Sequence, residues 1–282
     1  MTCADSSNSA APCAAGLILA INGADERLQL ALGRLPDVEG GGEGGGEGGE
    51  AELLASQEWT VPGQAVRFLA PNIRHMLDSL GLRAGELRRI ACVHGPGSFT
   101  GLRMSLALAE GLAAGLACAN GAQLAGINHL ALLAHEAAEL GAGAVLALAW
   151  SRRGQVYAQA FQGEAELTGP LVAHLAELPQ LLAALPRPLL LLGGGLRRNL
   201  PALQALAEAD PGLRLLPKGW DAPRPQTLLT LAGRAAFGPG PLSPLYLRAS
   251  DAEDNLAGIA AGRGLSEAEA KAILARGSRS LS

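Results

Sequence analysis

Residues 87–104, LRRIACVHGPGSFTGLRM, are the stretch that decides the fold of this chain. The apolar run 87–93 predicts a buried strand, because it is short, continuous and followed by glycine and proline. A glycine-rich loop then leads into a long run of small and apolar residues, 99–119, which predicts a helix. Strand, glycine-rich loop and helix together can aim backbone N–H groups at a phosphate or a carboxylate.

The loop itself combines glycines, which permit tight backbone geometry, with a proline that stiffens the turn. Ser98 and Thr100 can both cap the following helix. No Gly-Lys-Ser/Thr follows, so the loop is not a Walker A phosphate site. The alternative to ligand binding is a loop that only turns the chain and caps the helix. We define the signature loop as Gly95, Pro96, Gly97, Ser98, Phe99, Thr100, Gly101 and Arg103.

Upstream of this loop, the apolar pattern predicts three strands and one helix. The strands cover 17–21, 28–32 and 53–60, and the helix covers 62–80. Residues 37–52, DVEGGGEGGGEGGEAE, separate the second strand from the third. Such a Gly/Glu-rich segment can bury almost nothing, so we expect a solvated insertion in a hairpin.

Downstream of the loop, a strand at 123–127 and a helix at 129–140 complete a first half. The second half is predicted as a truncated repeat of the first. Three strands, helix, strand, helix, strand, helix is an order that suits an actin-like, ribonuclease-H-like α/β fold with two related subdomains. The elements expected in the second half are strands at 144–149, 155–161 and 189–192 and helices at 171–185 and 226–237.

These patterns divide the chain into four parts. Residues 1–16 are expected to form a disordered lead-in. Residues 17–125 and 126–250 are expected to form the N-terminal and C-terminal subdomains. Residues 251–282 are expected to form a tail, because their apolar residues show no core pattern before Leu265.

The composition argues against one class of function. Of the 282 residues, 49% are apolar and 3% are aromatic, so a core of Leu, Ala and Val is expected. The net charge is −4, and the only lysines are Lys218 and Lys271. A free-standing nucleic-acid binder that relies on a basic surface is therefore disfavoured. Any contact with nucleic acid is expected to come through a partner.

Cysteine usage and hydropathy indicate the compartment. The four cysteines form no CxxC pair, which indicates reduced thiols. The N-terminus lacks the early basic residues of a signal peptide. The most apolar helix, 104–119, is short for a membrane span and contains Glu110. We therefore expect a cytoplasmic protein with no membrane segment. The cysteines are Cys3, Cys13, Cys92 and Cys118.

Residues 95–103, GPGSFTGLR, and the small-residue helix that follows them resemble the signature of the TsaB family, also called YeaZ. Residues 244–248, PLYLR, resemble the closing segment of that family, and the likeness extends over roughly 17–250. The family belongs to the bacterial machinery that makes N6-threonylcarbamoyladenosine beside the anticodon of certain tRNAs. The resemblance implies an actin-like fold and an accessory subunit that is not itself an enzyme.

Actin-like phosphotransferases need carboxylates at strand ends to hold magnesium and orient a nucleophile. The resemblance places these positions at the ends of the first strands of the two halves, where this chain has Asn22 and Trp150. Asp25 lies nearby and is expected to be a hairpin-turn residue, with replacement of the lost charge as the alternative. No catalytic residue is assigned. An actin-like nucleotide hydrolase or kinase is the alternative function.

The histidines do not predict a metal site. The sister catalytic family, TsaD, carries an HxxxH metal motif, and residues 127–129, INH, stand in the matching place. The second ligand would fall on Leu133, and His135 points roughly 120° away from His129 on a helix. His94 has no identifiable catalytic partner, so a structural role is favoured. A metallopeptidase-like protein of the glycoprotease superfamily is a further alternative, and it would need the missing metal site.

A glycine run after the strand at 189–192 is a candidate nucleotide contact. It resembles the GGxxxN segment through which actin-like proteins approach adenosine. Without the carboxylates, binding without turnover is the most that it supports, and a plain strand-to-helix turn is the alternative. No cofactor is assigned to the chain alone, and ATP or ADP is considered only for the complex. The candidate contact residues are Gly193, Gly194, Gly195 and Asn199.

The resemblance implies that the chain supports a TsaD-type catalytic subunit through the helices before and after the signature loop. On the second helix, small residues recur at helical spacing, which lets two helices approach closely. Packing against the chain's own sheet is the alternative. A TsaE-type ATPase is a further candidate partner, a homodimer is a candidate state in isolation, and tRNA is expected only through the complex. The expected interface residues are Val66, Leu69, Ile73, Ala107, Gly111, Ala114 and Cys118.

Overall fold

The computed structural model describes residues 16–36, 50–61, 65–117, 121–141, 143–248, 260–266 and 268–269. Residues 37–49 of the Gly/Glu-rich segment, nearly all of the predicted lead-in, most of the predicted tail, Cys118 and the side chain of Val66 lie outside the described residues. The chain forms two compact units, residues 1–245 and 246–282. In the second unit, the buried Ala260 begins a short helical turn over 260–262. The predicted subdomain limits remain predictions.

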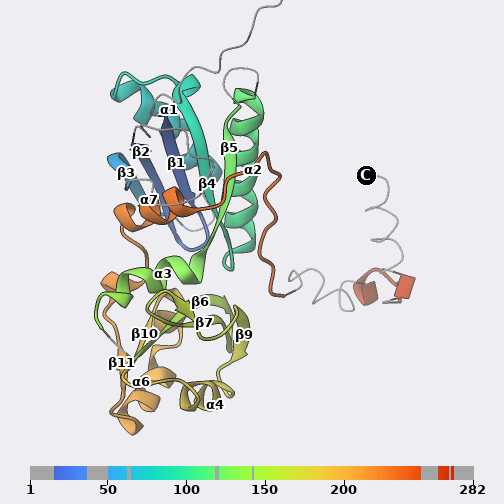
Figure 1. Ribbon diagram of the computed structural model, residues 1–282. Coiled ribbons are helices and arrows are strands. Elements are labelled where there is room, and N and C mark those ends of the chain that lie inside the picture. The colour runs from blue at the N-terminus through green and yellow to red at the C-terminus, as the bar shows by residue number, and fades with distance from the viewer. Residues whose placement is uncertain are drawn as a thin grey trace, which may run out of the picture. The chain divides into compact units, whose positions relative to one another are not determined.

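The first unit contains two sheets, and the first has the strand order β3-β2-β1-β4-β5 (Figure 1). The pairs β1–β2 and β2–β3 are antiparallel, whereas β1–β4 and β4–β5 are parallel. The predicted elements of this half are confirmed to within a few residues. They are β1 (Leu17–Asn22), β2 (Arg27–Arg34), β3 (Glu52–Thr60), α1 (Ala65–Ser79), β4 (Leu87–Gly95), α2 (Phe99–Leu116), β5 (Gln123–Asn128) and α3 (His129–Ala138).

The second sheet has the order β11-β10-β6-β7-β8, and β9 also pairs with β7. The pairs β6–β7 and β7–β9 are antiparallel, whereas β6–β10 and β10–β11 are parallel. The succession β9, β7, β6, β10, β11 therefore reproduces all five positions of the first sheet, and the prediction of a truncated repeat is wrong. The strands are β6 (Ala144–Arg152), β7 (Gln155–Gln162), β8 (Ala165–Glu166), β9 (Leu171–His174), β10 (Leu189–Leu192) and β11 (Leu213–Leu215).

The helix predicted over 171–185 is wrong in its first part. Residues 171–174 form β9, which pairs with Gln155–Ala158 of β7, and the helix α4 covers only Leu178–Ala183. The apolar residues of this stretch fit a helix or a strand, but the edge of β7 supplies hydrogen-bond partners that only the tertiary structure reveals. Beyond β10 follow α5 (Gly194–Arg198), α6 (Leu200–Ala209) and α7 (Pro225–Arg234).

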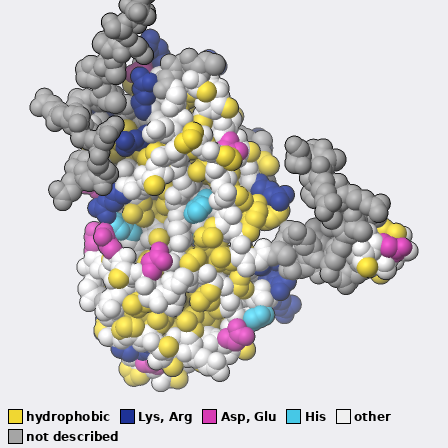
Figure 2. All heavy atoms as spheres, turned by 45° about the vertical axis from the view of Figure 1, so that its right-hand side comes forward, with side chains coloured by type: hydrophobic (Ala, Val, Ile, Leu, Met, Phe, Trp, Pro, Cys, Tyr) yellow, Lys and Arg dark blue, Asp and Glu magenta, His cyan; other side chains and the backbone are white. Residues whose placement is uncertain are grey.

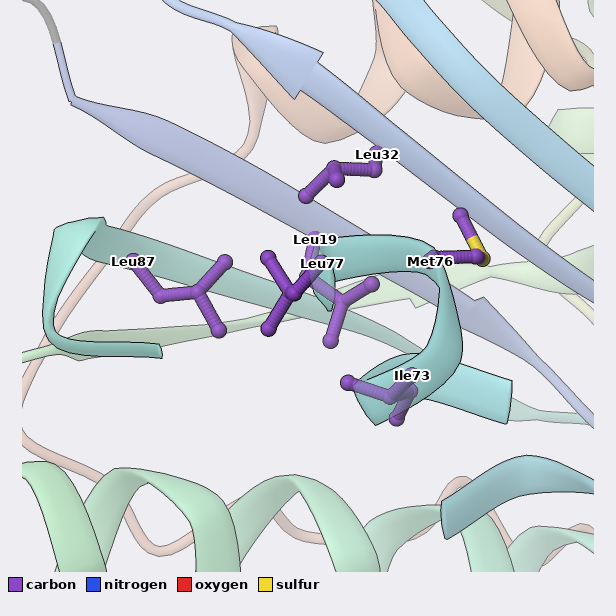
Figure 3. A pocket seen from close by; sticks show the side chains of 6 residues that line it. All are labelled: Leu19, Leu32, Ile73, Met76, Leu77 and Leu87. Atoms are coloured by element: carbon purple, nitrogen blue, oxygen red, sulfur yellow. The ribbon is translucent and has the colours of Figure 1, made fainter. Parts of the chain in front are cut away.

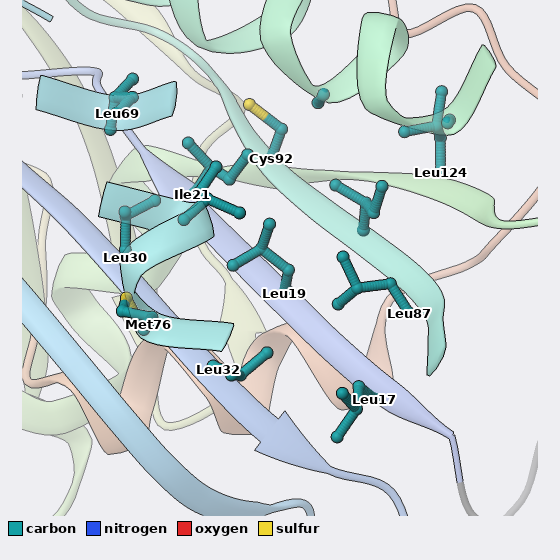
Figure 4. Close-up of a cluster of buried hydrophobic side chains, with 14 of the residues drawn as sticks. Leu17, Leu19, Ile21, Leu30, Leu32, Leu69, Met76, Leu87, Cys92 and Leu124 are labelled. Atoms are coloured by element: carbon teal, nitrogen blue, oxygen red, sulfur yellow. The ribbon is translucent and has the colours of Figure 1, made fainter. Parts of the chain in front are cut away.

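Aliphatic side chains fill the core between the first sheet and the helices α1 and α2, as the low aromatic content predicts. Leucines and isoleucines of β1, β2 and β4 meet Leu69 and Met76 of α1 (Figure 4). A small gap remains between α1 and the sheet, but it admits no water molecule and only apolar side chains line it (Figure 3). It is a packing gap within the core. Its lining residues are Leu19, Leu32, Ile73, Met76, Leu77 and Leu87.

Two helices, α3 and α7, each pack on the sheet of the other half, and we call them the exchanged helices. Helix α3 follows the first sheet in sequence but packs on β6 and β7, and α7 follows the second sheet but packs on β1 and β2. Figure 1 shows α7, in orange, beside the blue strands of the first sheet. Leu132 of α3 and Leu228 of α7 share one buried cluster with Ile18 of β1. Each sheet is therefore covered in part by a helix from the other half.

Glu136 ties the exchanged helices together. Its carboxylate, 8% exposed, accepts hydrogen bonds from the backbone N–H of Arg224 and, at 2.6 Å, from the hydroxyl of Thr227. The guanidinium of Arg224 lies 3.7 Å from the same carboxylate. A buried carboxylate on α3 thus caps the first turn of α7.

Replacing Glu136 with Ala is expected to lower the free energy of unfolding by about 2–4 kcal/mol, because hydrogen bonds to a charged group contribute about 1.5–3 kcal/mol each and are not additive. Urea unfolding measures this change. Glu139→Ala, an exposed change one residue beyond α3, is the control and is expected to stay within about 0.5 kcal/mol. Equal losses in the two variants would contradict the role of Glu136.

Candidate functional site

The signature loop joins the end of β4 to the start of α2 and packs against the turn between β1 and β2. The backbone N–H of Ser98 donates to the carbonyl of Ala24 at 2.7 Å. The hydroxyl of Ser98 accepts from the N–H of Gly101 at 3.3 Å and so caps α2. Of the two predicted caps, the structure uses Ser98, and Thr100 is an exposed residue of the first turn.

Two glycines of the loop lie where another backbone passes close by. A Cβ atom on Gly97 would lie 2.2 Å from the carbonyl oxygen of Ala24, and one on Gly101 would lie 2.1 Å from that of Gly23. Gly95 has a φ of 127°, a conformation that favours glycine. Gly97 and Gly101 thus allow the start of α2 to lie against the β1–β2 turn. The geometry therefore favours a loop that turns the chain and seats a helix.

The remaining loop residues also have partners in the chain. Pro96 is buried and follows a cis peptide bond. The guanidinium of Arg103 lies 3.9 Å from the ring centroid of Phe99, both on α2. Cation–π pairs of this kind contribute about 0.5–1 kcal/mol at exposed sites.

A segment from the end of the first unit covers the other side of the loop. Leu245 donates its backbone N–H to the carbonyl of His94 at 2.8 Å, and the ring Nδ1 of His94 lies 3.0 Å from the carbonyl of Ser243. The ring of His94 also lies close to Gly126. The structural role expected for His94 agrees with these contacts.

The strand ends that would carry carboxylates in an actin-like phosphotransferase carry none. Asn22 is buried, and its amide donates to Gln29 at 2.7 Å while its carbonyl oxygen accepts from the N–H of Ala24 at 3.1 Å. Trp150 stands at the other position, with the guanidinium of Arg198 5.4 Å from its ring centroid. Neither side chain can supply the charge that binds magnesium.

Asp25 lies in the β1–β2 turn, as predicted, but its carboxylate has a contact that sequence analysis missed. Its Oδ1 accepts from the N–H of Glu26 at 2.7 Å. A Cβ atom on Gly194, at the start of α5, would lie 2.3 Å from its Oδ2. Burial raises the pKa of Asp25, while the charges of His129 and Arg198 oppose that rise. No local pattern signals a contact between residues so far apart in sequence.

The glycine run is pressed against β6. A Cβ atom on Gly193 would lie 2.3 Å from the carbonyl oxygen of Leu148, and one on Gly195 would lie 2.8 Å from that of Ala149. The buried side chain of Asn199 donates to the carbonyl of Gly195 at 2.8 Å. Every residue of the candidate nucleotide contact thus meets a neighbour within the chain, which favours the strand-to-helix turn.

The residues around His129, at the start of α3, also make their contacts within the chain. Asn128 caps α3, and its amide donates to Gln159 of β7 at 2.8 Å. His129 is buried, which lowers its pKa, and neither ring nitrogen has a hydrogen-bond partner among the described residues. Leu133 is also buried. In the described part of the chain, no group of three His, Cys, Asp or Glu side chains is placed to hold a metal ion.

The small-residue face of α2 points to solvent. Ala107, Gly111 and Ala114 are exposed, and a Cβ atom on Gly111 would have no neighbour within 4 Å. For these three residues, packing against the chain's own sheet is therefore wrong. Leu69 and Ile73 of α1 differ, because both are buried in the core of the first sheet. Figure 2 turns the α2 side toward the viewer and shows mostly hydrophobic and uncharged surface over its upper part.

Among the described residues, none of the helices combines the length and hydropathy that a membrane crossing requires.

Residues 61–185 match the family model of TsaD, the tRNA N6-adenosine threonylcarbamoyltransferase. The chain is 31% identical over 102 residues to the tRNA threonylcarbamoyladenosine biosynthesis protein TsaB of Escherichia coli (strain K12). That match covers 36% of this chain and 42% of the E. coli protein. It therefore spans less than half of the relative.

Two solved structures from Pseudomonas aeruginosa are similar over a greater length. An uncharacterized protein with similarity to peptidase YEAZ is 25% identical, with a TM-score of 0.58, and the match covers 83% of this chain and all of that one. YeaZ is 24% identical, with a TM-score of 0.57 and coverage of 82% and 100%. With two sheets of repeated strand order, the fold is the actin-like, ribonuclease-H-like α/β fold. Signature loop, fold and relatives agree, and in all three the chain is similar to the TsaB/YeaZ family.

Proposed function

We propose that this chain is the non-catalytic TsaB-type partner of a TsaD-type transferase, which forms N6-threonylcarbamoyladenosine next to the anticodon of tRNA in the cytoplasm. The observation that carries the proposal is the exposed face of α2 formed by Ala107, Gly111 and Ala114. Small side chains let a second helix approach closely and pack its ridges into grooves. Helix α2 has 18 residues, which gives about 27 Å of length for such packing.

The interface that we propose is narrower than the one expected from the sequence. Leu69 and Ile73 belong to the core of the first sheet, so they support α1 from within and are not part of the proposed surface. The exposed residues of α1 include Ala70, Pro71 and Arg74. A TsaE-type ATPase and a homodimer in isolation remain further proposals, and tRNA is proposed to contact the complex.

The test of this function is reconstitution with the TsaD of the same organism. The two proteins are expected to co-purify, and the chain is expected to raise the rate at which TsaD, with the remaining components, modifies tRNA. Modification is measured by nucleoside analysis of the tRNA. A TsaD that works equally well without this chain would overturn the proposal.

The isolated chain is expected to show neither ATP hydrolysis nor threonylcarbamoyl transfer, because Asn22 and Trp150 occupy the two strand ends. Phosphate release and tRNA modification are the two assays. The alternative function, a nucleotide hydrolase, would instead give steady turnover that Asp25→Asn abolishes, since Asp25 is the first carboxylate after the end of β1 in the sequence. Turnover that survives this substitution would point to a contaminant.

A further inference from the structure

The chain crosses from the first sheet to the second at Asn128 and His129, where β5 ends and α3 begins. Asn128 is bonded on both sides of its amide: the oxygen accepts from the N–H of Leu130 at 2.9 Å, and the nitrogen donates to Gln159 at 2.8 Å. His129 is 1% exposed, yet neither ring nitrogen has a hydrogen-bond partner among the described residues. Buried polar side chains are normally hydrogen-bonded, so this imidazole needs an explanation.

The residue one turn further along α3 shows what His129 faces. Leu133 lies four positions on, hence on the same face of the helix, and it is buried. A Cβ atom on Gly193 would lie 3.2 Å from the Cδ1 of Leu133 and 2.3 Å from the carbonyl oxygen of Leu148 in β6. His129 therefore belongs to the face of α3 that packs on the second sheet, beside β6 and β7 (Figure 1).

A positive charge is disfavoured at this place. Burial lowers the pKa of His129, and the charge of Asp25, in the β1–β2 turn, opposes that fall. The first turn of α3 also carries the positive end of the helix dipole, which repels a cation. Glu136, two turns along the same helix, is bound to Thr227 and to the backbone N–H of Arg224. The buried ring is therefore held in its neutral form.

The other elements that contact α3 offer the ring no free counter-charge among the described residues. The strands β5, β7 and β10 contain no charged residue. Titratable side chains on β4, β6 and α7 have partners of their own. These pairs are His94 with Ser243, Arg89 with Phe237, Arg152 with Gln155, and Arg234 with Glu164.

We propose that His129 is an acid-sensitive latch: the neutral ring lets α3 stay packed on β6 and β7, and protonation of the ring releases α3 from the second sheet. Once released, the ring reaches water and takes up a proton at its ordinary pKa of about 6.5. Packing is therefore fully stable above about pH 6.5 and weakens as the pH falls below it, down to the lower pKa of the packed ring. The latch acts on an exchanged helix and does not depend on the proposed partner function.

Urea unfolding of the full chain between about pH 8 and pH 5 tests the latch. Below about pH 6.5, the unfolding equilibrium constant of the parent chain is expected to rise by up to about tenfold more per pH unit than that of His129→Gln, which cannot take up the proton. His75→Gln removes an exposed histidine from α1 and is the matched control, expected to follow the parent. Equal pH dependence in the parent and in His129→Gln overturns the proposal.

Two measurements on the parent chain need no substitution, so they decide the matter even if His129→Gln does not fold. Nuclear magnetic resonance follows the five histidine rings during acidification. One ring is expected to stay neutral at about pH 5.5, and five ordinary titrations overturn the proposal.

Hydrogen exchange locates the opening. After correction for the intrinsic exchange rate, amides of α3 are expected to lose more protection on acidification than amides of β4. An equal loss in both elements would mean that the whole chain unfolds together, and it overturns a latch that acts on α3.

Discussion

Gly111→Leu is expected to abolish binding to a TsaD-type partner and to leave the melting temperature of the isolated chain unchanged or higher. Gly111 lies on the exposed face of α2, where an added side chain meets no atom of the chain itself. Leucine favours the helix over glycine by up to about 1 kcal/mol, so the isolated chain gains from the change. A partner helix seated on small residues would be pushed outward by a leucine, which removes the close packing that the interface depends on.

Two measurements on the same protein separate these effects: thermal unfolding of the chain alone, and calorimetric binding to the purified partner. Gly233→Leu is the matched control, because Gly233 lies in α7 and an added Cβ atom there also meets no neighbour. That variant should bind the partner normally. If Gly111→Leu binds as well as the parent chain does, the interface lies elsewhere.

Gly101→Ala is expected to destabilise the chain by about 1–3 kcal/mol, the usual cost of overpacking. Its Cβ atom would lie 2.1 Å from the carbonyl oxygen of Gly23, which belongs to the backbone and can move only if the β1–β2 turn moves. Gly111→Ala, on the same helix, is expected to stabilise the chain by up to about 1 kcal/mol. The same Gly→Ala substitution in α2 is thus expected to lower the free energy of unfolding at position 101 and to raise it at position 111.

Urea unfolding of the two variants and the parent chain measures both effects. If Gly101→Ala leaves the free energy of unfolding unchanged, the signature loop has room for a side chain. The glycines of the loop would then be explained by contact with a ligand. A destabilising Gly111→Ala would show that α2 is covered by some part of the chain.

The first sheet was predictable because its strands are short apolar runs separated by glycine, proline or charged turns. The start of α2 was predictable from Ser98, whose capping role is local. Strand β9 was not predictable, because Leu171–His174 becomes a strand through pairing with β7. Helical spacing found the apolar side of α1 but assigned it to a partner. Periodicity identifies which side of a helix is apolar, and it does not identify what covers that side.

The contacts of the candidate site were even less predictable from the sequence than the packing of α1. The glycines of the signature loop were found by pattern, but their purpose depends on the carbonyl oxygens of Gly23 and Ala24 in another hairpin. The contact between Asp25 and Gly194 joins the two halves of the chain, and no sequence motif contains both residues. Close approach of two backbones is a property of the folded chain.

The exchanged helices have a consequence for synthesis on the ribosome, where domains generally fold as units from the N-terminus. One face of the first sheet, with Ile18, Ala20 and Ala31, is buried together with Leu228 and Ala232 of α7. When residue 140 leaves the exit tunnel, all five strands of that sheet have been made, but this apolar face still lacks its helix. This face of the nascent first half therefore stays partly exposed until α7, which ends at Arg234, has also been synthesised. A premature stop within the second half would release a chain with an open apolar face, suited to aggregation and to capture by chaperones.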